Sequence, residues 1–275
     1  MDWLWLILMG LGTGAYGILV GAGGGFILGP ILLVFMDLEP KVMAGTVLAS
    51  VAISSISGAV AYRRMKVIDY RSGLLFAAAA IPGSVLGALG VGSIAPNTFR
   101  ILFGVLLLAL AALLALRPNL PDPETVESPK HILSTTVRSR RIRTEDRIEY
   151  RYEFNELLAT SFNVFLGFIS SFFGTGGGFL RTPVLISAFG FPVRVAVATS
   201  VFALSFYATV GAATHATLGH VEWYPTFLFT GIGLVVGGQI GARLTSKVKG
   251  PWIMRLLLIV VLILGIRLIY EGIWG

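Results

Sequence analysis

The sequence predicts an all-α protein that crosses a membrane several times, and three observations support this fold class. First, 55% of the 275 residues are hydrophobic and 13% are charged, with a mean hydropathy of +0.84, which leaves too little polar surface to cover a soluble globule. Second, several apolar runs reach the roughly 18 to 20 residues that cross a bilayer core. Third, the second half of the chain repeats the pattern of the first.

Apolar segments occur in two sets of five, separated by a polar stretch. The first set is Trp3–Val20, Phe26–Met36, Val42–Tyr62, Ser72–Val91 and Phe99–Leu116. The second set is Leu157–Phe173, Phe179–Phe189, Val193–His215, Pro225–Leu244 and Trp252–Tyr270. We therefore expect a first membrane repeat at 1–116, a linker at 117–154 and a second membrane repeat at 155–275.

The second segment of each set is too short to cross a bilayer. Phe26–Met36 has 11 residues, which span about 16 Å as a helix. We expect it to fold back on the preceding helix as a hairpin that is bent at a glycine run, with three full spans completing the half. The alternative is that the two segments are ordinary spans.

An internal duplication is visible residue by residue. Gly21–Pro30 matches Gly174–Pro183 at six of ten positions, at an offset of 153 residues. A Gly-x-x-x-Gly spacing, typical of helix packing, occurs at Gly83 and Gly87. It recurs at Gly237 and Gly241, one residue later than the offset of 153 predicts. Such a duplication is typical of transporters built from internal repeats.

Loop charges indicate that the two repeats are inverted. The Tyr62–Arg71 loop is strongly basic, whereas its counterpart, Ala216–Tyr224, has no Lys or Arg. Because basic loops stay on the cytoplasmic side, these equivalent loops should face opposite sides of a cell inner membrane. The segments expected to be cytoplasmic are Tyr62–Arg71, Arg117–Arg151 and Arg243–Lys249. Both chain ends would then lie outside.

The central basic linker has a strand pattern of its own. From Ile148 to Phe154, apolar and charged residues alternate, and the turn-like Thr144-Glu145-Asp146 precedes them. With Leu133–Arg141 as a partner, this pattern predicts a small cytoplasmic β-hairpin. A disordered charged linker is the alternative.

The glycine runs are the first candidate for chemistry. They resemble the start of a dinucleotide fingerprint, but no strand and crossover helix surround them and no phosphate-loop lysine follows. In a membrane, broken helices near the midplane expose backbone N–H groups and positive helix ends, which favour an anion. The expected binding residues are Gly23, Gly24, Gly25, Phe26, Gly176, Gly177, Gly178 and Phe179. The alternative is that these glycines only allow close helix packing.

Arg181 is the second candidate, because it lies inside the second glycine motif. The carboxylates outside the linker all fall at expected span ends, so we expect no buried carboxylate, and a cation substrate is disfavoured. We expect Arg181 to attract or bind an anion. The alternative is an arginine that extends to the membrane surface.

Small polar residues beyond each hairpin are further candidates. The hydroxyls of Thr46, Thr199, Ser200 and Tyr207 could donate to an oxyanion, or they could bond within their own helices. His215 is a candidate for a pH-sensitive gate, with an outer-interface residue as the alternative.

Other classes of function are disfavoured. The chain has no cysteine, and its Ser, His and Asp residues form no hydrolase pattern, so we expect no enzyme. The three histidines suggest no metal site, and we expect no cofactor. The +7 net charge is concentrated in loops, which argues against binding of nucleic acid. Oligomeric state is left open, since packing glycines serve contacts within and between chains.

The paired motif Gly-x-Gly-Gly-Gly-Phe-x-x-x-Pro, at Gly21–Pro30 and Gly174–Pro183, resembles that of the sulfite exporter TauE/SafE family. The resemblance covers nearly the whole chain. It implies a multipass carrier for sulfite, sulfoacetate or other organosulfonate anions, often moving outward. It also implies importance for the glycines, phenylalanines and prolines of both motifs, while Arg181 stands where the first motif has Leu28.

We therefore expect a secondary transporter that exposes a midplane anion site alternately to the two sides. A passive anion channel on the same scaffold is one alternative. The other is a membrane assembly or interaction protein that acts through the cytoplasmic hairpin.

Overall fold

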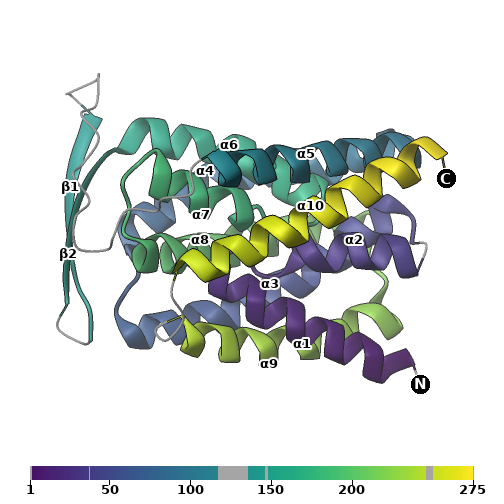
Figure 1. Cartoon of the computed structure of the whole chain (residues 1–275), viewed down its shortest axis with the longest axis horizontal. Helices are drawn as coiled ribbons and strands as arrows, with labels where there is room; N and C mark the ends of the chain where they lie inside the picture. The colour runs from purple at the N-terminus through teal and green to yellow at the C-terminus, as the bar shows by residue number, and fades with distance from the viewer. Residues whose placement is uncertain (1, 37, 117–135, 146–147, 246–249, 275) are drawn as a thin grey trace.

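The computed structural model describes residues 2–36, 38–116, 136–145, 148–245 and 250–274. Its helices lie along one direction, with a two-stranded sheet across one end of the bundle and both chain ends at the other (Figure 1). We call these the hairpin end and the terminal end. The first five helices are α1 (Asp2–Val20), α2 (Gly25–Phe35), α3 (Pro40–Met65), α4 (Tyr70–Gly90) and α5 (Pro96–Leu116), with a short turn η1 (Val91–Ser93) before α5.

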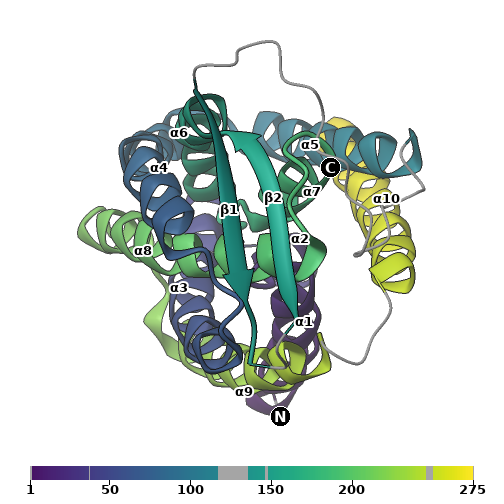
Figure 2. The same cartoon turned by 90° about the vertical axis from the view of Figure 1, so that its left-hand side faces the viewer.

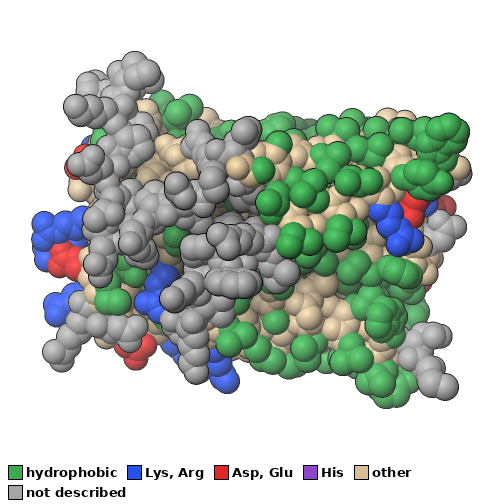
Figure 3. All heavy atoms as spheres, viewed as in Figure 1, with side chains coloured by type: hydrophobic (Ala, Val, Ile, Leu, Met, Phe, Trp, Pro, Cys, Tyr) green, Lys and Arg blue, Asp and Glu red, His purple; other side chains and the backbone are tan. Residues whose placement is uncertain are grey.

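The helices after the sheet repeat this order. They are α6 (Glu156–Phe172), α7 (Gly178–Ser187), α8 (Val193–Thr217), α9 (Leu228–Leu244) and α10 (Gly250–Trp274), with a π-helical turn η3 (Trp223–Phe227) before α9. Among the described residues, five helices are long and apolar enough to span a bilayer, and hydrophobic side chains are spread over the right-hand half of the face in Figure 3. The predicted polytopic all-α fold is confirmed.

The glycine runs break the helices where the sequence predicts. Gly21, Gly23 and Gly24 have φ angles of 86°, 74° and 93°, and their equivalents 153 residues later have φ angles of 68°, 85° and 63°. Side chains rarely tolerate this left-handed region, so consecutive glycines are what allow the chain to leave α1 and α6 sharply. The short helices α2 and α7 then begin inside the protein, where Phe26 and Phe179 are fully buried.

The helix contacts of one half are mirrored in the other. A side-chain carbon added at Gly87 would be 2.8 Å from the backbone nitrogen of Phe172 in α6, while one added at Gly237 would be 2.8 Å from that of Ala15 in α1. Thus α4 packs directly on α6, and α9 packs on α1, as the Gly-x-x-x-Gly spacing predicts. The long helices α3 and α8 pack on each other between these pairs.

The predicted hairpin is also confirmed. Strands β1 (Val137–Arg143) and β2 (Glu149–Asn155) are antiparallel, with Arg140 opposite Tyr152, and they cross the end of the bundle (Figure 2). The first strand extends two residues beyond the predicted Arg141, and residues 133–135 lie outside the described part. The alternation has the expected cause, because Tyr152 and Phe154 turn inward and pack on Phe191, with ring centroids 4.5 and 4.7 Å apart.

One expectation about charge was wrong, since the protein does contain a buried carboxylate. Asp69, just before α4, is only 6% exposed because the hairpin covers it. Its Oδ2 accepts hydrogen bonds from Tyr152 Oη at 2.8 Å and Ser72 Oγ at 2.6 Å, and Arg140 Nε lies 3.5 Å away. The hairpin is therefore attached to the end of the bundle by a charged network, which lies at the hairpin end and away from the glycine runs.

Candidate anion-binding site

The two glycine runs meet backbone to backbone inside the protein. Phe26 and Phe179, which are equivalent residues, stack with ring centroids 5.4 Å apart and ring planes 17° apart. A side-chain carbon added at Gly25 would lie 2.8 Å from the carbonyl oxygen of Gly174. The close approach of the runs thus has no room for side chains, and it brings the starts of α2 and α7 together.

Some of the backbone N–H groups that the sequence predicts to be free form hydrogen bonds within the bends. The N–H groups of Ala22 and Gly23 donate to the carbonyl oxygen of Gly17 at 2.6 and 3.1 Å, and that of Gly178 donates to Gly176 at 2.7 Å. The helix starts themselves have no side-chain cap at either Gly24 or Gly177. The residues at the cap positions therefore offer no side chain to the positive ends of α2 and α7.

Arg181 is buried beside the second run, with 1% of its surface exposed. Its Nε donates to Asn163 Oδ1 at 2.6 Å, and its Nη1 donates to Tyr207 Oη at 3.1 Å. The guanidinium carbon also lies 4.7 Å from the centre of the Tyr207 ring. The arginine is held by groups inside the protein, so it does not extend to the membrane surface.

The partners of Arg181 leave its charge without an anion. Asn163, Tyr207 and the carbonyl oxygen of Ser200, 3.4 Å from Nη1, are all neutral, and in the described part of the chain no carboxylate forms an ion pair with it. Its second amino group, Nη2, is buried and has no hydrogen-bond partner. A buried charge in this condition costs several kcal/mol unless an anion joins it, roughly as for other unpaired buried ions.

The neutral partners fix the orientation of the guanidinium. Asn163 Nδ2 donates to the carbonyl oxygen of Ala159 at 2.7 Å, which turns Oδ1 of the amide toward Arg181. The Tyr207 hydroxyl donates to the carbonyl oxygen of Gly176, so Arg181 is linked to the glycine run through that tyrosine. The geometry therefore presents Nη2 as a fixed donor beside the run.

Three buried hydroxyls near this point also have no partner, namely those of Thr175, Thr182 and Ser200. Thr175 lies within the second run, Thr182 follows Arg181 and reaches the turn at Gly21, and the carbonyl of Ser200 contacts Arg181. Each is an available donor for an oxyanion.

The structure does not bring Thr46 and Thr199 to Arg181. Thr46 Oγ1 accepts the backbone N–H of Glu222 at 2.9 Å, and Thr199 Oγ1 accepts that of Asp69 at 3.0 Å. These equivalent threonines hold the loops at opposite ends of the bundle. Their predicted role in substrate binding stays a prediction.

Comparison with known proteins identifies the family. The family model described as sulfite exporter TauE/SafE matches residues 6–268. The chain belongs to this family. It is 32% identical to "Probable membrane transporter protein YunE" of Bacillus subtilis over 100% of both chains. It is 28% identical to "Probable membrane transporter protein MJ0441" of Methanocaldococcus jannaschii, over 92% of this chain and 90% of that one. No solved structure matches the chain.

One residue of this TauE/SafE protein's candidate site, Asn163, was not among the residues that the sequence singled out, and Tyr207 was named only as a possible donor to the anion. Asn163 and Tyr207 hold Arg181, and neither belongs to the glycine motif. Asn163 had a signal in the sequence, since it is a polar residue in the middle of an apolar helix and its equivalent in the first repeat is Gly10. A polar side chain at such a position is expensive and usually has a partner.

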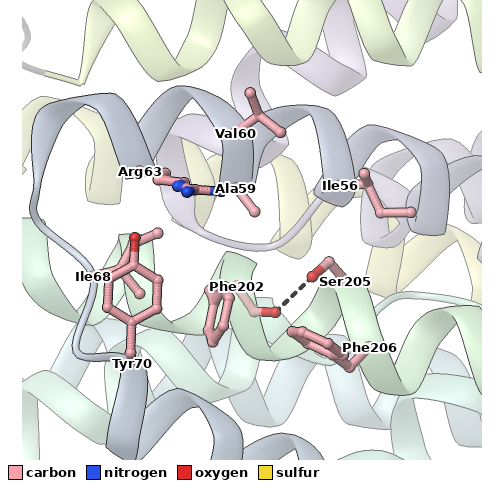
Figure 4. Close-up of a pocket in the computed structure, with 9 residues that line it drawn as sticks. All are labelled: Ile56, Ala59, Val60, Arg63, Ile68, Tyr70, Phe202, Ser205 and Phe206. Carbon is pink, nitrogen blue, oxygen red and sulfur yellow. Dashed lines mark hydrogen bonds between the residues drawn. The ribbon is translucent and has the colours of Figure 1, made fainter.

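A pocket of about 450 Å³ lies elsewhere in the protein, between α3 and α8 (Figure 4). Its lining is mostly apolar, with Arg63 and Ser205 as polar members. Ser200 and Tyr207 are seven residues apart and share one face of α8, whereas Phe202 and Phe206 line the pocket from another face. The pocket is thus separated from Arg181 by the body of α8.

Proposed function

We propose that this TauE/SafE protein is a secondary transporter for small sulfur-containing anions such as sulfite, sulfoacetate or other organosulfonates. The observation that carries the proposal is Arg181, a buried cation with an unpartnered amino group and no carboxylate partner in the described chain. The family supports the substrate class and an exporter's direction. The same residues would bind the anion in either direction of transport.

The chemistry of the site suits an oxyanion. Arg181 Nη2 supplies the charge-assisted donor, and the hydroxyls of Ser200 and Thr182 supply neutral donors nearby. A sulfonate or sulfite group has three oxygens that accept such bonds from different directions. Because the surroundings are buried, these interactions are stronger than in water.

The repeated architecture supports a mechanism of alternating access. Equivalent loops lie at opposite ends of the bundle, and the crossing of the glycine runs lies between them. We propose that the hairpin end, with its basic loops, faces the cytoplasm in a cell inner membrane. The two halves would then move relative to each other around an anion held at Arg181.

Uptake of labelled sulfite and sulfoacetate into proteoliposomes tests the proposal, with sulfate and acetate as competitors. Saturable uptake that sulfonates inhibit is the expected result. Unsaturable flux driven only by the salt gradient would instead indicate a passive channel. Absence of flux for all these anions, from protein shown to be folded, would overturn the proposed substrate class.

A matched pair of variants connects this flux to the site. Arg181→Lys keeps the charge but loses the bonds to both Asn163 and Tyr207, so we expect a raised KM. Leu28→Met, at the equivalent position of the first half, should leave KM unchanged. Equal effects of the two variants would remove Arg181 from the site.

A further inference from the structure

Each repeat fastens its broken hairpin to its long helix with one side chain, and the two fastenings lie at opposite ends of the bundle. At the hairpin end, Tyr62 Oη donates to the carbonyl oxygen of Ile18 at 3.0 Å. At the terminal end, His215 Nε2 lies 2.9 Å from the carbonyl oxygen of Ser171. Tyr62 and His215 are equivalent at the offset of 153, and so are Ile18 and Ser171. We call these contacts the tyrosine tie and the histidine tie.

The histidine tie has a second imidazole as its neighbour, whereas Tyr62 Oη lies 2.9 Å from the hydroxyl oxygen of Thr245. His215 Nδ1 lies 3.3 Å from His220 Nδ1, and the first-half equivalent of His220 is Val67. His215 is fully buried, whereas His220 is partly exposed in the loop after α8. The terminal end therefore carries a pair of contacting imidazoles, whereas the hairpin end carries a phenol that contacts a threonine hydroxyl.

Hydrogen-bond chemistry assigns the protons of this pair. A carbonyl oxygen can only accept, so His215 Nε2 must carry the hydrogen that bonds to Ser171. In the neutral ring Nδ1 of His215 is then an acceptor, and His220 Nδ1 must be the donor in the contact between the rings. The remaining nitrogen, His220 Nε2, is free to take a proton.

The number of protons on the pair decides whether the contact survives. With one added proton, one ring still offers an acceptor nitrogen to the other. With two added protons, both Nδ1 atoms carry hydrogen, and two positive rings face each other at 3.3 Å. Double protonation must therefore separate the rings.

The surroundings of the pair give little compensation for added charge. Burial lowers the pKa of His220, and the positive charge of Lys41 in α3 lowers it further. Lys41 is paired with Glu39 at 2.9 Å, and the carboxylate of Glu222 accepts from Thr226. The contacts from α6 and η1 come from the Ser171 carbonyl and from Gly92, which do not titrate.

We propose that His215 and His220 form a proton-binding site whose double protonation separates the two rings and releases the loop after α8 from that helix at the terminal end. The tyrosine tie has no group that titrates near neutral pH, so of the two ties only the one with imidazoles responds to acid near that pH. The inference goes beyond the proposed function by assigning proton sensitivity to one side. An anion approaching the protonated pair would favour its charged form, which offers a route for coupling protons to transport.

Nitrogen-15 NMR of the imidazoles tests the proton assignment without any substrate. The chain has three histidines, so a His131→Gln variant leaves only the pair visible. At neutral pH we expect hydrogen on Nε2 of His215 and on Nδ1 of His220. On acidification, the second protonation should break the hydrogen bond between the two Nδ1 atoms. A His215 that carries hydrogen on Nδ1 at neutral pH, or that titrates independently of His220, would overturn the proposal.

Hydrogen exchange tests the release of the loop. We expect the backbone N–H of His220, which donates to the carbonyl oxygen of His215 at 2.9 Å, to exchange faster as pH falls, after correction for intrinsic rates, by about tenfold per pH unit once the second site titrates. The last turn of α1, where Ile18 accepts from Tyr62, should show no such change. A matched variant, His215→Tyr with His220→Val, gives the terminal end the residues of the hairpin end and should abolish the response. An equal acid response of the last turn of α1 and of the His220 N–H in the wild-type protein would overturn the proposal even if the variant failed to fold. Neither experiment involves an anion substrate, so neither depends on the proposed function being correct.

Discussion

The two halves of the protein share a backbone and differ in chemistry. Both break their first helix with three left-handed glycines at equivalent positions, and both contribute one phenylalanine to the central stack. Yet Arg181 and Asn163 in the second half correspond to Leu28 and Gly10 in the first. The duplication thus supplied a symmetric scaffold, and the polar site was built on one side of it only.

The same asymmetry extends to the hydroxyls around the site. Thr175 corresponds to Ala22 and Ser200 to Val47, so the unpartnered donors all belong to the second half. An anion at the crossing of the runs would therefore contact a polar wall on one side and an apolar wall on the other. In the proposed mechanism, the charge of Arg181 would select the anion, and the symmetry of the two halves would serve the motion.

The largest expected effect comes from replacing Arg181 with leucine, the residue at the equivalent position of the first half. Arg181→Leu removes the charge and its donors, and we expect transport efficiency to fall about 100-fold, as for loss of a charge-assisted contact of about 3 kcal/mol. Thermal stability should be unchanged or raised, because an uncompensated buried charge is removed. Uptake assays and thermal unfolding of Arg181→Leu beside Leu28→Ala measure both. Unchanged uptake would show that the charge is not part of the pathway.

The scaffold should behave in the opposite way, with both halves equally sensitive. Gly23→Ala and Gly176→Ala each place a methyl group at a positive φ and 2.8 Å from the side chain of Val51. We expect each to lower stability by about 2 kcal/mol or more. Gly12→Ala is the control, since it has no neighbour within 4 Å and should be close to neutral. A large difference between the two run variants in thermal unfolding would contradict the symmetry of the scaffold.

Asn163→Asp sharpens the comparison by giving Arg181 the carboxylate that it lacks. The new charge would lie about where Asn163 Oδ1 now accepts from Nε at 2.6 Å, so the guanidinium gains an internal counter-ion. We expect the fold to be kept and anion affinity to fall about tenfold, because the substrate must compete with that carboxylate. Equilibrium binding of labelled sulfite measures the change, with Asn163→Gln as the uncharged control. An affinity equal to that of wild type would show that the charge of Arg181 is not used in binding.

The parts of this structure that could be read from the sequence are those set by local chemistry. Three successive glycines predict a break wherever they occur, and alternation from Ile148 to Phe154 predicts a strand whatever it packs on. The parts that could not be read depend on contacts between distant segments. Asp69 is buried only because a hairpin 83 residues away along the chain places Tyr152 over it. Asn163 meets Arg181 only because α6 and α7 fold back on each other.

Variants of Thr46 and Thr199 should give the smallest effect. They distinguish a role in anchoring loops from a role in binding substrate. Thr46 and Thr199 each accept a loop N–H, from Glu222 and Asp69, at 2.9 and 3.0 Å. If both act only as acceptors for the loops, Thr46→Val and Thr199→Val should each cost about 1 kcal/mol of stability and change uptake equally. Because Thr199 precedes Ser200 in the polar half, a role in substrate binding would instead raise KM for Thr199→Val alone. Comparing KM and unfolding temperature for the two variants distinguishes these outcomes, since a defect in loop anchoring alters stability in both halves while a lost substrate contact alters only the second.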